Sequence, residues 1–357
     1  MKSMTKFNYT TTHVGSIPHP TLNGITDKLA AMLDAPAWPQ LPRRTFRENM
    51  YVQYSPSLPA IVEDAAKETI YFDTRADITP ALEAFYTPFL ADDVNAFALR
   101  PEYATGFFAM LETLKVANPK SAICNQQFAK GQVTGPISFG LTVTDQDLRA
   151  SLYNEILADA ILKNAAMNAR WQVRQLKTVR SNVIIFVDEP YMASFGSAFI
   201  SLSREQVIAM LDEVFNAIHA EGALAGVHCC ANTDWGVLLA TKVDILNLDA
   251  YGYIEKLALY PAELRAFLDR GGAVAWGIVP NNEEIYRVTA EGLAKHLRGG
   301  IRLMSEKAMA RGVTIRPAEF NERSLLVPAC GLGSTSVEIA DRVFEVLSQT
   351  ATHLRQG

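Results

Sequence analysis

Two segments of the chain carry the side-chain types of a metal site. The first is His228-Cys229-Cys230, and the second contains Cys330, about a hundred residues later. Residues two apart on an extended segment point the same way, so His228 and Cys230 can share one ion while Cys229 faces away. Two thiolates and one imidazole suit Zn²⁺, and three protein ligands leave a fourth position for a substrate. The alternative is that the cysteines are small buried hydrophobes and His228 is an ordinary core residue.

The softness of these ligands favours one class of reaction. Hydrolytic zinc sites rely on histidine and carboxylate, which leave the ion acidic enough to ionise water. Two thiolates donate more charge and favour a thiol substrate, whose pKa zinc would lower while the electron-rich site keeps the sulfur nucleophilic. The ligand set therefore points to alkyl transfer to sulfur.

Further polar residues stand directly after short apolar runs of the sequence. Asp188 and Glu189 follow one run, and we expect both to bind substrate, with Asp188 as the catalytic candidate. Asp188 can hold the ammonium of an amino-acid substrate or simply cap the next helix. Asp249 follows another run and is either a fourth zinc ligand or a helix cap. Gly15 and Ser16 offer N–H groups and a hydroxyl that could bind a carboxylate or an amine, or they form a plain turn.

The apolar runs that precede these residues predict the strands of a parallel sheet. Runs that are apolar at successive positions are typical of strands buried on both faces. The clearest are Val183–Val187, Ala223–Val227, Asp244–Leu248, Ala273–Val279 and Leu325–Val327, and the weaker ones are Thr10–Val14, Ile70–Asp73 and Phe128–Val133. Eight strands with helical returns favour an α/β (β/α)8 TIM barrel, in which active sites lie at the carboxyl ends of the strands. The candidate residues gather at those ends.

Helical patterns fill the intervals between these runs. Ser203 to Gln206 reads as a capping box that begins a helix, and Gly222 suits the position just after its end. The chain is longer than a barrel of about 250 residues. We expect residues 1–357 to form one barrel domain, with the excess in helical and loop insertions at about 21–63 and 74–122, near the barrel rim in the N-terminal third.

Composition excludes several classes of function. The net charge of −5 and the lack of a Lys/Arg-dense run argue against nucleic-acid binding. No apolar run approaches the roughly 20 residues that span a bilayer, and the first residues lack the apolar core of a signal peptide. Four cysteines are too few for a disulfide scaffold, so we expect reduced thiols and a cytoplasmic protein that does not bind membranes.

Taken in order, the motifs of the chain resemble those of the zinc-dependent methyltransferases related to the catalytic domain of cobalamin-independent methionine synthase. HVGSIPHP, from His13 to Pro20, resembles the family's Gly-Ser-x-Pro segment, and GQVTGP (Gly131–Pro136) resembles its strand ending in Thr-Gly-Pro. VDEP, which contains Asp188 and Glu189, resembles its Asp-Glu-Pro. The resemblance extends from about Thr12 to Ser336 and implies a (β/α)8 barrel, within the wider superfamily of uroporphyrinogen decarboxylase.

The resemblance also implies roles for individual residues. His228 and Cys230 match two zinc ligands, and Cys330 in ACGL matches a third. Asp249 stands where the family carries a fourth ligand, a glutamate one methylene longer. Ser16 would contact homocysteine and Asp188 would hold its amine.

The activity implied is methyl transfer to the thiol of homocysteine, forming methionine, with zinc as the cofactor. This chain lacks the family's second, N-terminal barrel and the histidine after the seventh strand, where it reads GIVPNNEE. The family's acidic contact to the amine has only Glu48 and Gln53 as candidates here. The methyl donor is therefore left as either 5-methyltetrahydrofolate or a methylcorrinoid protein.

Three alternatives stay open at the level of sequence. The first is corrinoid-dependent methyl transfer to another thiol such as coenzyme M. The second is a metal-free decarboxylase of the uroporphyrinogen type, whose cationic pocket would have to come from Arg43, Arg44 and Arg47. The third is a non-catalytic protein that binds a corrinoid or a thiol.

Overall fold

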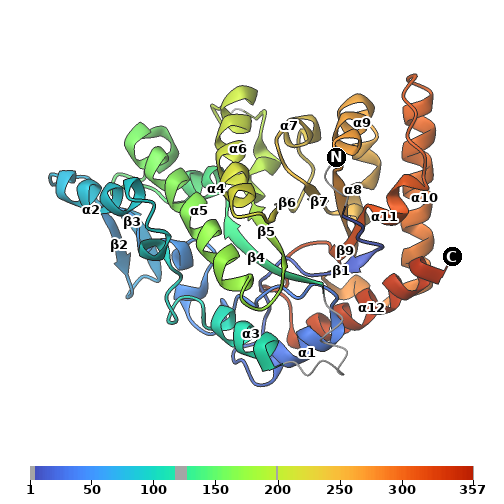
Figure 1. The fold of residues 1–357 in the computed structure, drawn as a ribbon, viewed down its shortest axis with the longest axis horizontal. Helices are drawn as coiled ribbons and strands as arrows, with labels where there is room; N and C mark the ends of the chain where they lie inside the picture. Colours follow the sequence, from blue (N-terminus) through green and yellow to red (C-terminus); the bar gives the residue numbers. More distant parts are fainter. Residues whose placement is uncertain (1–4, 117–126, 198–199, 357) are drawn as a thin grey trace.

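The computed structural model describes residues 5–116, 127–197 and 200–356, and its centre is one sheet of parallel strands. The sheet is curled, and helices surround it (Figure 1). Seven strands form it, in the spatial order β1 (Thr10–Thr11), β9 (Ser324–Pro328), β8 (Ala273–Val279), β7 (Ile245–Leu248), β6 (Leu224–Cys229), β5 (Asn182–Asp188) and β4 (Phe128–Thr134). Apart from β1, these strands follow one another around the sheet in chain order, as in a TIM-like barrel.

The extended segment 35–40 lies between the two edge strands of this sheet. On one side the Gln40 N–H donates to the Gly15 carbonyl after β1, at 3.1 Å. On the other side the Lys130 N–H in β4 donates to the Pro36 carbonyl, also at 3.1 Å. These contacts are isolated bridges and not a regular ladder. Pro36 and Pro39 have no N–H to donate, which prevents a continuous strand at this place.

The expectation of eight barrel strands is therefore corrected to seven strands and a bridging segment. The five clearest runs and Phe128–Val133 are confirmed as strands of the sheet, and Thr10–Val14 is a strand only over Thr10–Thr11. The run Ile70–Asp73 is not part of this sheet, because β3 (Thr69–Phe72) pairs antiparallel with β2 (Ile61–Asp64) in a separate hairpin. A short apolar run predicts a strand but not the sheet that the strand joins.

The helices begin and end as follows. The α-helices are α1 (Ile25–Met32), α2 (Thr79–Leu90), α3 (Thr105–Val116), α4 (Pro136–Thr142), α5 (Glu155–Leu176), α6 (Arg204–Ala220), α7 (Trp235–Ala240), α8 (Ala250–Leu257), α9 (Pro261–Asp269), α10 (Ala290–Met309), α11 (Glu319–Glu322) and α12 (Val337–Gln356). Short 3₁₀ turns are η1 (Phe46–Glu48), η2 (Val52–Tyr54), η3 (Val94–Phe97), η5 (Ser151–Tyr153), η6 (Pro190–Ser194) and η7 (Glu283–Tyr286). Of the described helices, none is long and apolar enough to cross a membrane.

Local sequence signals set several of these boundaries. The Ser203–Gln206 capping box is present at the start of α6, and Gly222 adopts a positive φ of 67° after its end. Asn154 caps α5 by accepting from the N–H groups of Ile156 and Leu157. The expected insertion at 21–63 contains the bridging segment, and that at 74–122 contains α2, η3 and α3, while residues 117–122 lie outside the described ranges.

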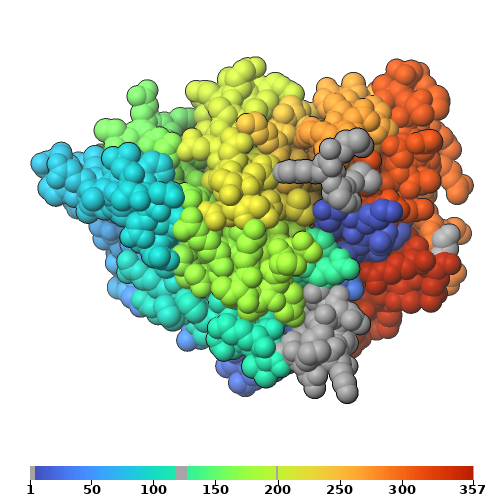
Figure 2. Space-filling view, viewed as in Figure 1, coloured from blue at the N-terminus to red at the C-terminus, as the bar shows by residue number. Residues whose placement is uncertain are grey.

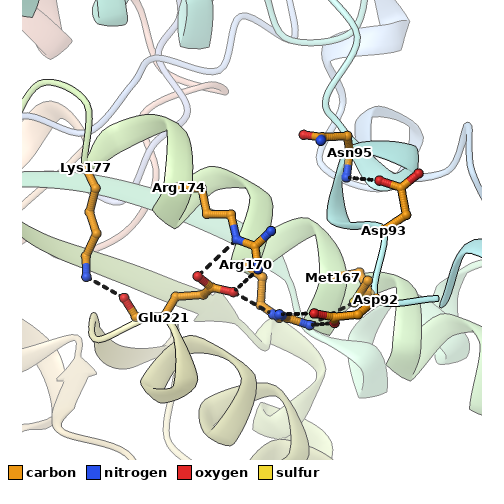
Figure 3. Close-up of polar contacts among 8 residues, drawn as sticks. All are labelled: Asp92, Asp93, Asn95, Met167, Arg170, Arg174, Lys177 and Glu221. Atoms are coloured by element: carbon orange, nitrogen blue, oxygen red, sulfur yellow. Dashed lines mark hydrogen bonds and ion pairs between the residues drawn. The ribbon is translucent and has the colours of Figure 1, made fainter. Parts of the chain in front are cut away.

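Helix α2 lies at the outer edge of the molecule (Figures 1 and 2). A charged cluster ties the loop after this helix to the barrel. Arg170 of α5 pairs with Asp92 and also donates to Glu221 at 2.9 Å (Figure 3). Arg174 pairs with the same glutamate at 2.8 Å, and Lys177 donates to its backbone carbonyl. The cluster therefore joins α5, the end of α6 and the segment after α2.

Candidate metal centre

His228, Cys230 and Cys330 meet at the carboxyl ends of two strands. His228 lies in β6, Cys230 directly follows that strand, and Cys330 follows β9. The ligand atoms of the three residues all lie within 4.8 Å of one another. His228 Nε2 is 2.9 Å from Cys230 Sγ and 4.0 Å from Cys330 Sγ. The parallel sheet thus brings together residues that lie about a hundred positions apart in the chain.

Asn247 fixes the orientation of the His228 ring. Its Nδ2 donates to the Ala275 carbonyl at 2.8 Å, which leaves Oδ1 as the atom that faces His228 Nδ1, at 2.6 Å. His228 Nδ1 must then be the donor, so Nε2 is the ring atom presented to the two sulfurs. A hydrogen-bonded Nδ1–H with Nε2 free to coordinate is the usual arrangement of a metal-binding histidine.

The distances within this group fit a zinc ion. With zinc–nitrogen and zinc–sulfur bonds of usual length, ligand atoms of a tetrahedral site lie roughly 3.6 Å apart. The two measured nitrogen–sulfur distances, 2.9 and 4.0 Å, lie on either side of that value. A shift of a few tenths of an ångström in each side chain would bring both distances to the value expected around zinc. Two sulfurs and one imidazole are donors that zinc prefers, and they leave the fourth position open.

The protonation states of the Cys230 and Cys330 thiols also favour the binding of a cation between them. A hydrogen bond from Cys230 lowers the pKa of Cys330, and the neighbouring His228 lowers it further. The same hydrogen bond, together with burial, raises the pKa of Cys230. Cys330 is thus held as a thiolate, and it raises the pKa of His228 in spite of that ring's burial. A cation among these atoms would replace the shared proton.

Cys229 has no part in this group. Its side chain is buried, its Sγ faces the Ala231 carbonyl at 3.5 Å, and burial raises the pKa of its thiol to about 12. The alternation expected for His228 to Cys230 is therefore what the structure shows. Cys229 is a small hydrophobic core residue.

Asp188 presents a carboxylate to the same cavity. It ends β5 and is 5% exposed, and its buried Oδ1 has no hydrogen-bond partner among the described residues. Burial raises the pKa of this carboxyl, whereas the charges of His228 and Lys130 lower it. A buried carboxylate oxygen without a partner costs free energy, and a positively charged ligand would recover that cost.

The cavity that joins these groups has a volume of about 420 Å³. Its lining includes all three members of the metal group, together with Asp188, Ser16 and Glu48. This volume falls within the range of roughly 300–1,000 Å³ that small-molecule sites occupy. The site is therefore large enough for an amino acid beside the metal group.

Gly15 and Ser16 form a turn at the rim of this cavity. Ser16 Oγ accepts from the Gly333 N–H at 3.3 Å, so the turn packs against the segment that carries Cys330. Gly15 has a φ of 153°, and a Cβ there would lie 2.8 Å from the Gln40 and Gln132 side chains. Only glycine allows the backbone to approach this closely.

Glu189 and Asp249 cap helices in this structure. Both oxygens of Glu189 accept backbone N–H groups at the start of α4, from Ile137 at 3.0 Å and Ser138 at 2.7 Å, and the residue is fully buried. Asp249 accepts from the Gly252 N–H at the start of α8, at 2.9 Å. Among the described residues, Asp249 is not within the group whose ligand atoms lie together, although burial and, to a smaller extent, the charge of Cys330 raise the pKa of its carboxyl.

The structure places the two candidates for the acidic contact to the amine, and it adds two residues that the sequence did not predict. Glu48 lines the cavity and is held by Arg44, whereas Gln53 is buried and bonds to Gln40. Asn247 and Lys130 were missed. Asn247 is a polar residue inside an otherwise apolar strand, and that pattern was the available signal, whereas the strand of Lys130 also contains Gln132 and Thr134 and gave no such signal.

Comparisons with known proteins give a likeness of fold. No family model matches the chain, and no curated protein matches its sequence. Among solved structures, a B12-independent methionine synthase from Shewanella sp. W3-18-1, in complex with selenomethionine, is similar with a TM-score of 0.52 and 16% identity over 98% of each chain.

Two further solved structures share less of the fold. A glycoside hydrolase has a TM-score of 0.44 and 10% identity over 96% of this chain and 99% of its own. A beta-glycosidase from Thermosphaera aggregans has a TM-score of 0.44 and 11% identity over 93% of this chain and 85% of its own. The likeness to the methionine synthase, with its TM-score of 0.52, agrees with a parallel sheet surrounded by helices.

Proposed function

We propose that the chain is a cytoplasmic, zinc-dependent methyltransferase that transfers a methyl group to the thiol of homocysteine and forms methionine. The observation that carries the proposal is the group of His228, Cys230 and Cys330 beside the unpartnered carboxylate of Asp188, in one cavity. The whole chain acts as one barrel domain with the insertions described above. The similar methionine synthase structure contains selenomethionine, an amino acid related to the proposed product, which supports this substrate class.

In this proposal, one set of cavity residues binds the metal and another binds the amino-acid end of the substrate. His228, Cys230 and Cys330 would hold zinc, which supplies a Lewis acid that lowers the pKa of a thiol. Asp188 accepts the ammonium of homocysteine through Oδ1, and the Gly15–Ser16 turn contacts its amino-acid end.

This placement directs the substrate sulfur toward the methyl donor. The thiolate sulfur forms its bond to the methyl carbon as the bond from donor to methyl breaks, and the donor keeps that electron pair. The protein contributes proximity and orientation to this step. The donor is 5-methyltetrahydrofolate or a methylcorrinoid protein.

The structure weakens two of the alternatives. Coenzyme M carries a sulfonate, which the buried carboxylate of Asp188 would repel. The decarboxylase needs a cationic pocket, yet Arg44 pairs with Glu48 at 2.8 Å, and Arg47 pairs with Glu63 at 2.7 Å. The cavity lining contains no arginine among the described residues.

Zinc-edge X-ray absorption with and without L-homocysteine tests the proposal. We expect a bound zinc with one nitrogen and two sulfur ligands from the protein, and one more sulfur after homocysteine is added. Cys330→Ser should lose the metal and all methyl transfer, whereas Cys229→Ala, a matched change at the thiol that faces away, should keep both.

Four results would contradict this proposal. A protein without zinc, or a zinc shell that ignores homocysteine, would reject the activation of the thiol. A fully active Cys330→Ser variant would do the same. Zinc and homocysteine binding without turnover with methyltetrahydrofolate or methylcobalamin would favour the non-catalytic binding protein.

A further inference from the structure

A second cavity, the amino-end cavity, lies at the end of the barrel opposite the metal centre. Its volume is about 510 Å³, which is larger than that of the cavity beside His228. Asn8 and Tyr9, which directly precede β1, line one side, and the segment 317–321 before β9 lines another. Helices α10 and α12 complete the lining. The amino-end cavity therefore lies at the amino ends of the strands and shares no lining residue with the metal centre.

Three arginines line this cavity, Arg298 and Arg302 from α10 and Arg355 from α12. None of the described residues in its lining is acidic. Arg355 pairs with Asp34 outside the lining, so its charge is compensated. Neither Arg298 nor Arg302 pairs with a carboxylate among the described residues. The cavity therefore presents two uncompensated positive charges to a ligand.

The placement of Arg298 and Arg302 is unfavourable for helix α10 by itself. Residues four apart on a helix are neighbours, and like charges at that spacing repel. The two acids of the adjoining α11, Glu319 and Glu322, pair with other cations at 2.9 and 2.7 Å. An anion that binds both guanidinium groups would remove this repulsion.

Backbone carbonyls hold two of the three arginines in place. Arg298 Nη2 donates to the His353 carbonyl at 3.0 Å, and Arg355 Nε donates to the Asn8 carbonyl, also at 3.0 Å. Such bonds use only some of the N–H donors of a guanidinium group. Arg298 keeps Nε and Nη1 for a ligand, and Arg302 makes no bond to the described residues, so all of its donors are available.

The rest of the lining combines a neutral donor with apolar surface. Tyr9 is 6% exposed and donates its hydroxyl hydrogen to Asn321 Oδ1 at 2.9 Å, which leaves Asn321 Nδ2 without a partner among the described residues. Asn8 and Tyr9 have positive φ angles of 47° and 59°, which residues other than glycine rarely adopt. The protein thus accepts backbone strain to hold Tyr9 at this place. Apolar side chains extend the surface beside its ring: Ile301, Pro317 and Leu354.

We propose that the amino-end cavity binds a small phosphomonoester with an apolar or aromatic body. A phosphomonoester carries a charge of about −1.5 to −2 at pH 7, which matches the uncompensated charges of Arg298 and Arg302. Arginine binds phosphate oxygens through paired N–H bonds, and Asn321 Nδ2 adds a neutral donor. The body of the ligand lies against Tyr9 and the apolar side chains. The volume of the cavity falls within the roughly 300–1,000 Å³ of small-molecule sites.

Isothermal titration calorimetry of the full chain with adenosine 5′-monophosphate (AMP) tests the inference. Adenosine lacks only the phosphate and is the matched probe. Phenyl phosphate is a second phosphomonoester with a different body, and phenol is its matched probe. In about 50 mM salt, we expect each phosphomonoester to bind at least about tenfold more tightly than its matched probe. Both affinities should fall as the salt concentration rises, because the arginines are exposed.

Three variants locate the bound phosphate. Arg302→Gln removes one charge without breaking a bond among the described residues, so it should fold normally and weaken AMP binding by about tenfold or more. Arg342→Gln is the matched control, because Arg342 is an arginine of α12 that pairs with Glu345 at 3.2 Å and does not line the cavity. Arg342→Gln should keep its AMP affinity. Cys330→Ser, which alters the metal centre, should also bind AMP as the unaltered protein does.

Each outcome supports or overturns the inference. A chain that binds neither phosphomonoester, or that binds AMP and adenosine equally, overturns it. Unchanged AMP affinity in Arg302→Gln, or an equal loss in Arg342→Gln, overturns it because the phosphate then does not depend on this cavity. Loss of AMP binding in Cys330→Ser overturns it by placing the phosphate at the metal centre. Failure of the unaltered protein to bind zinc or homocysteine rejects the proposed function alone, since the two sites share no residue.

Discussion

Replacing Asn247 by leucine removes the hydrogen-bond acceptor that orients the His228 ring. Leucine has nearly the shape of asparagine, and Asn247 is fully buried, so the change alters hydrogen bonding more than packing. His228 Nδ1 loses its 2.6 Å contact, and the Ala275 carbonyl loses its 2.8 Å donor. The ring can then turn Nε2 away from the two sulfurs.

The size of the effect follows from the unpaired donor. Leaving a buried N–H group without an acceptor costs about 1–3 kcal/mol. Loss of a residue that hydrogen-bonds a ligating histidine typically lowers metal affinity by about 10- to 100-fold. A change of that size corresponds to about 1.4–2.8 kcal/mol, so the two values agree. We therefore expect Asn247→Leu to weaken zinc binding by about 10- to 100-fold.

Competition with a zinc chelator of known affinity measures this loss. Asn247→Asp keeps an acceptor for His228 Nδ1, so its zinc affinity should stay within about threefold of the unaltered protein. Asn168→Leu is the matched control, since Asn168 is also buried and donates to the Phe97 carbonyl at 3.1 Å, far from the cavity. That control should lose stability and keep its zinc affinity. Equal zinc affinity in Asn247→Leu and Asn168→Leu would refute the reasoning.

Two further predictions concern Asp249 and His13. Asp249→Asn should keep both stability and zinc affinity, because asparagine also caps helices. Asp249→Ala should lower the free energy of unfolding, measured by urea titration, by about 1 kcal/mol. A large loss of zinc affinity in Asp249→Asn would instead identify Asp249 as a zinc ligand. Burial and the charge of Lys130 lower the pKa of His13 to about 3, so the unfolded chain takes up this proton first as the pH falls below about 6.5. The free energy of unfolding should therefore fall by about 1.4 kcal/mol for each pH unit below 6.5, relative to that of His13→Leu. If the free energies of unfolding of the two proteins change in parallel between pH 7 and 5, His13 is not buried in its neutral form.

The strands of the sheet were predictable where burial on both faces left a continuous apolar run. Ala273–Val279 is the clearest case, because its predicted and observed bounds agree. The bridging segment 35–40 was not predictable in this way. Its two prolines and scattered apolar residues read as a loop, and its place in the barrel depends on backbone groups of Gly15 and Lys130 that lie far away in sequence.

The roles of the acidic residues were open in the sequence for a physical reason. An aspartate or glutamate after a strand can cap a helix or face a cavity, and the local pattern is the same in both cases. The structure separates neighbours in a single motif: Asp188 faces the cavity with a free oxygen, whereas Glu189 turns to the N–H groups of α4.

The sequence by itself determined the donor types of the candidate site, since side-chain types and the spacing of two between His228 and Cys230 are local properties of an extended segment. The tertiary structure decided which groups meet. The curl of the sheet brings Cys330 to within 4.0 Å of His228, places Asn247 Oδ1 against His228 Nδ1, and buries Lys130 completely. These contacts join strands that are separated by tens to a hundred residues, and no local pattern encodes the distance between them.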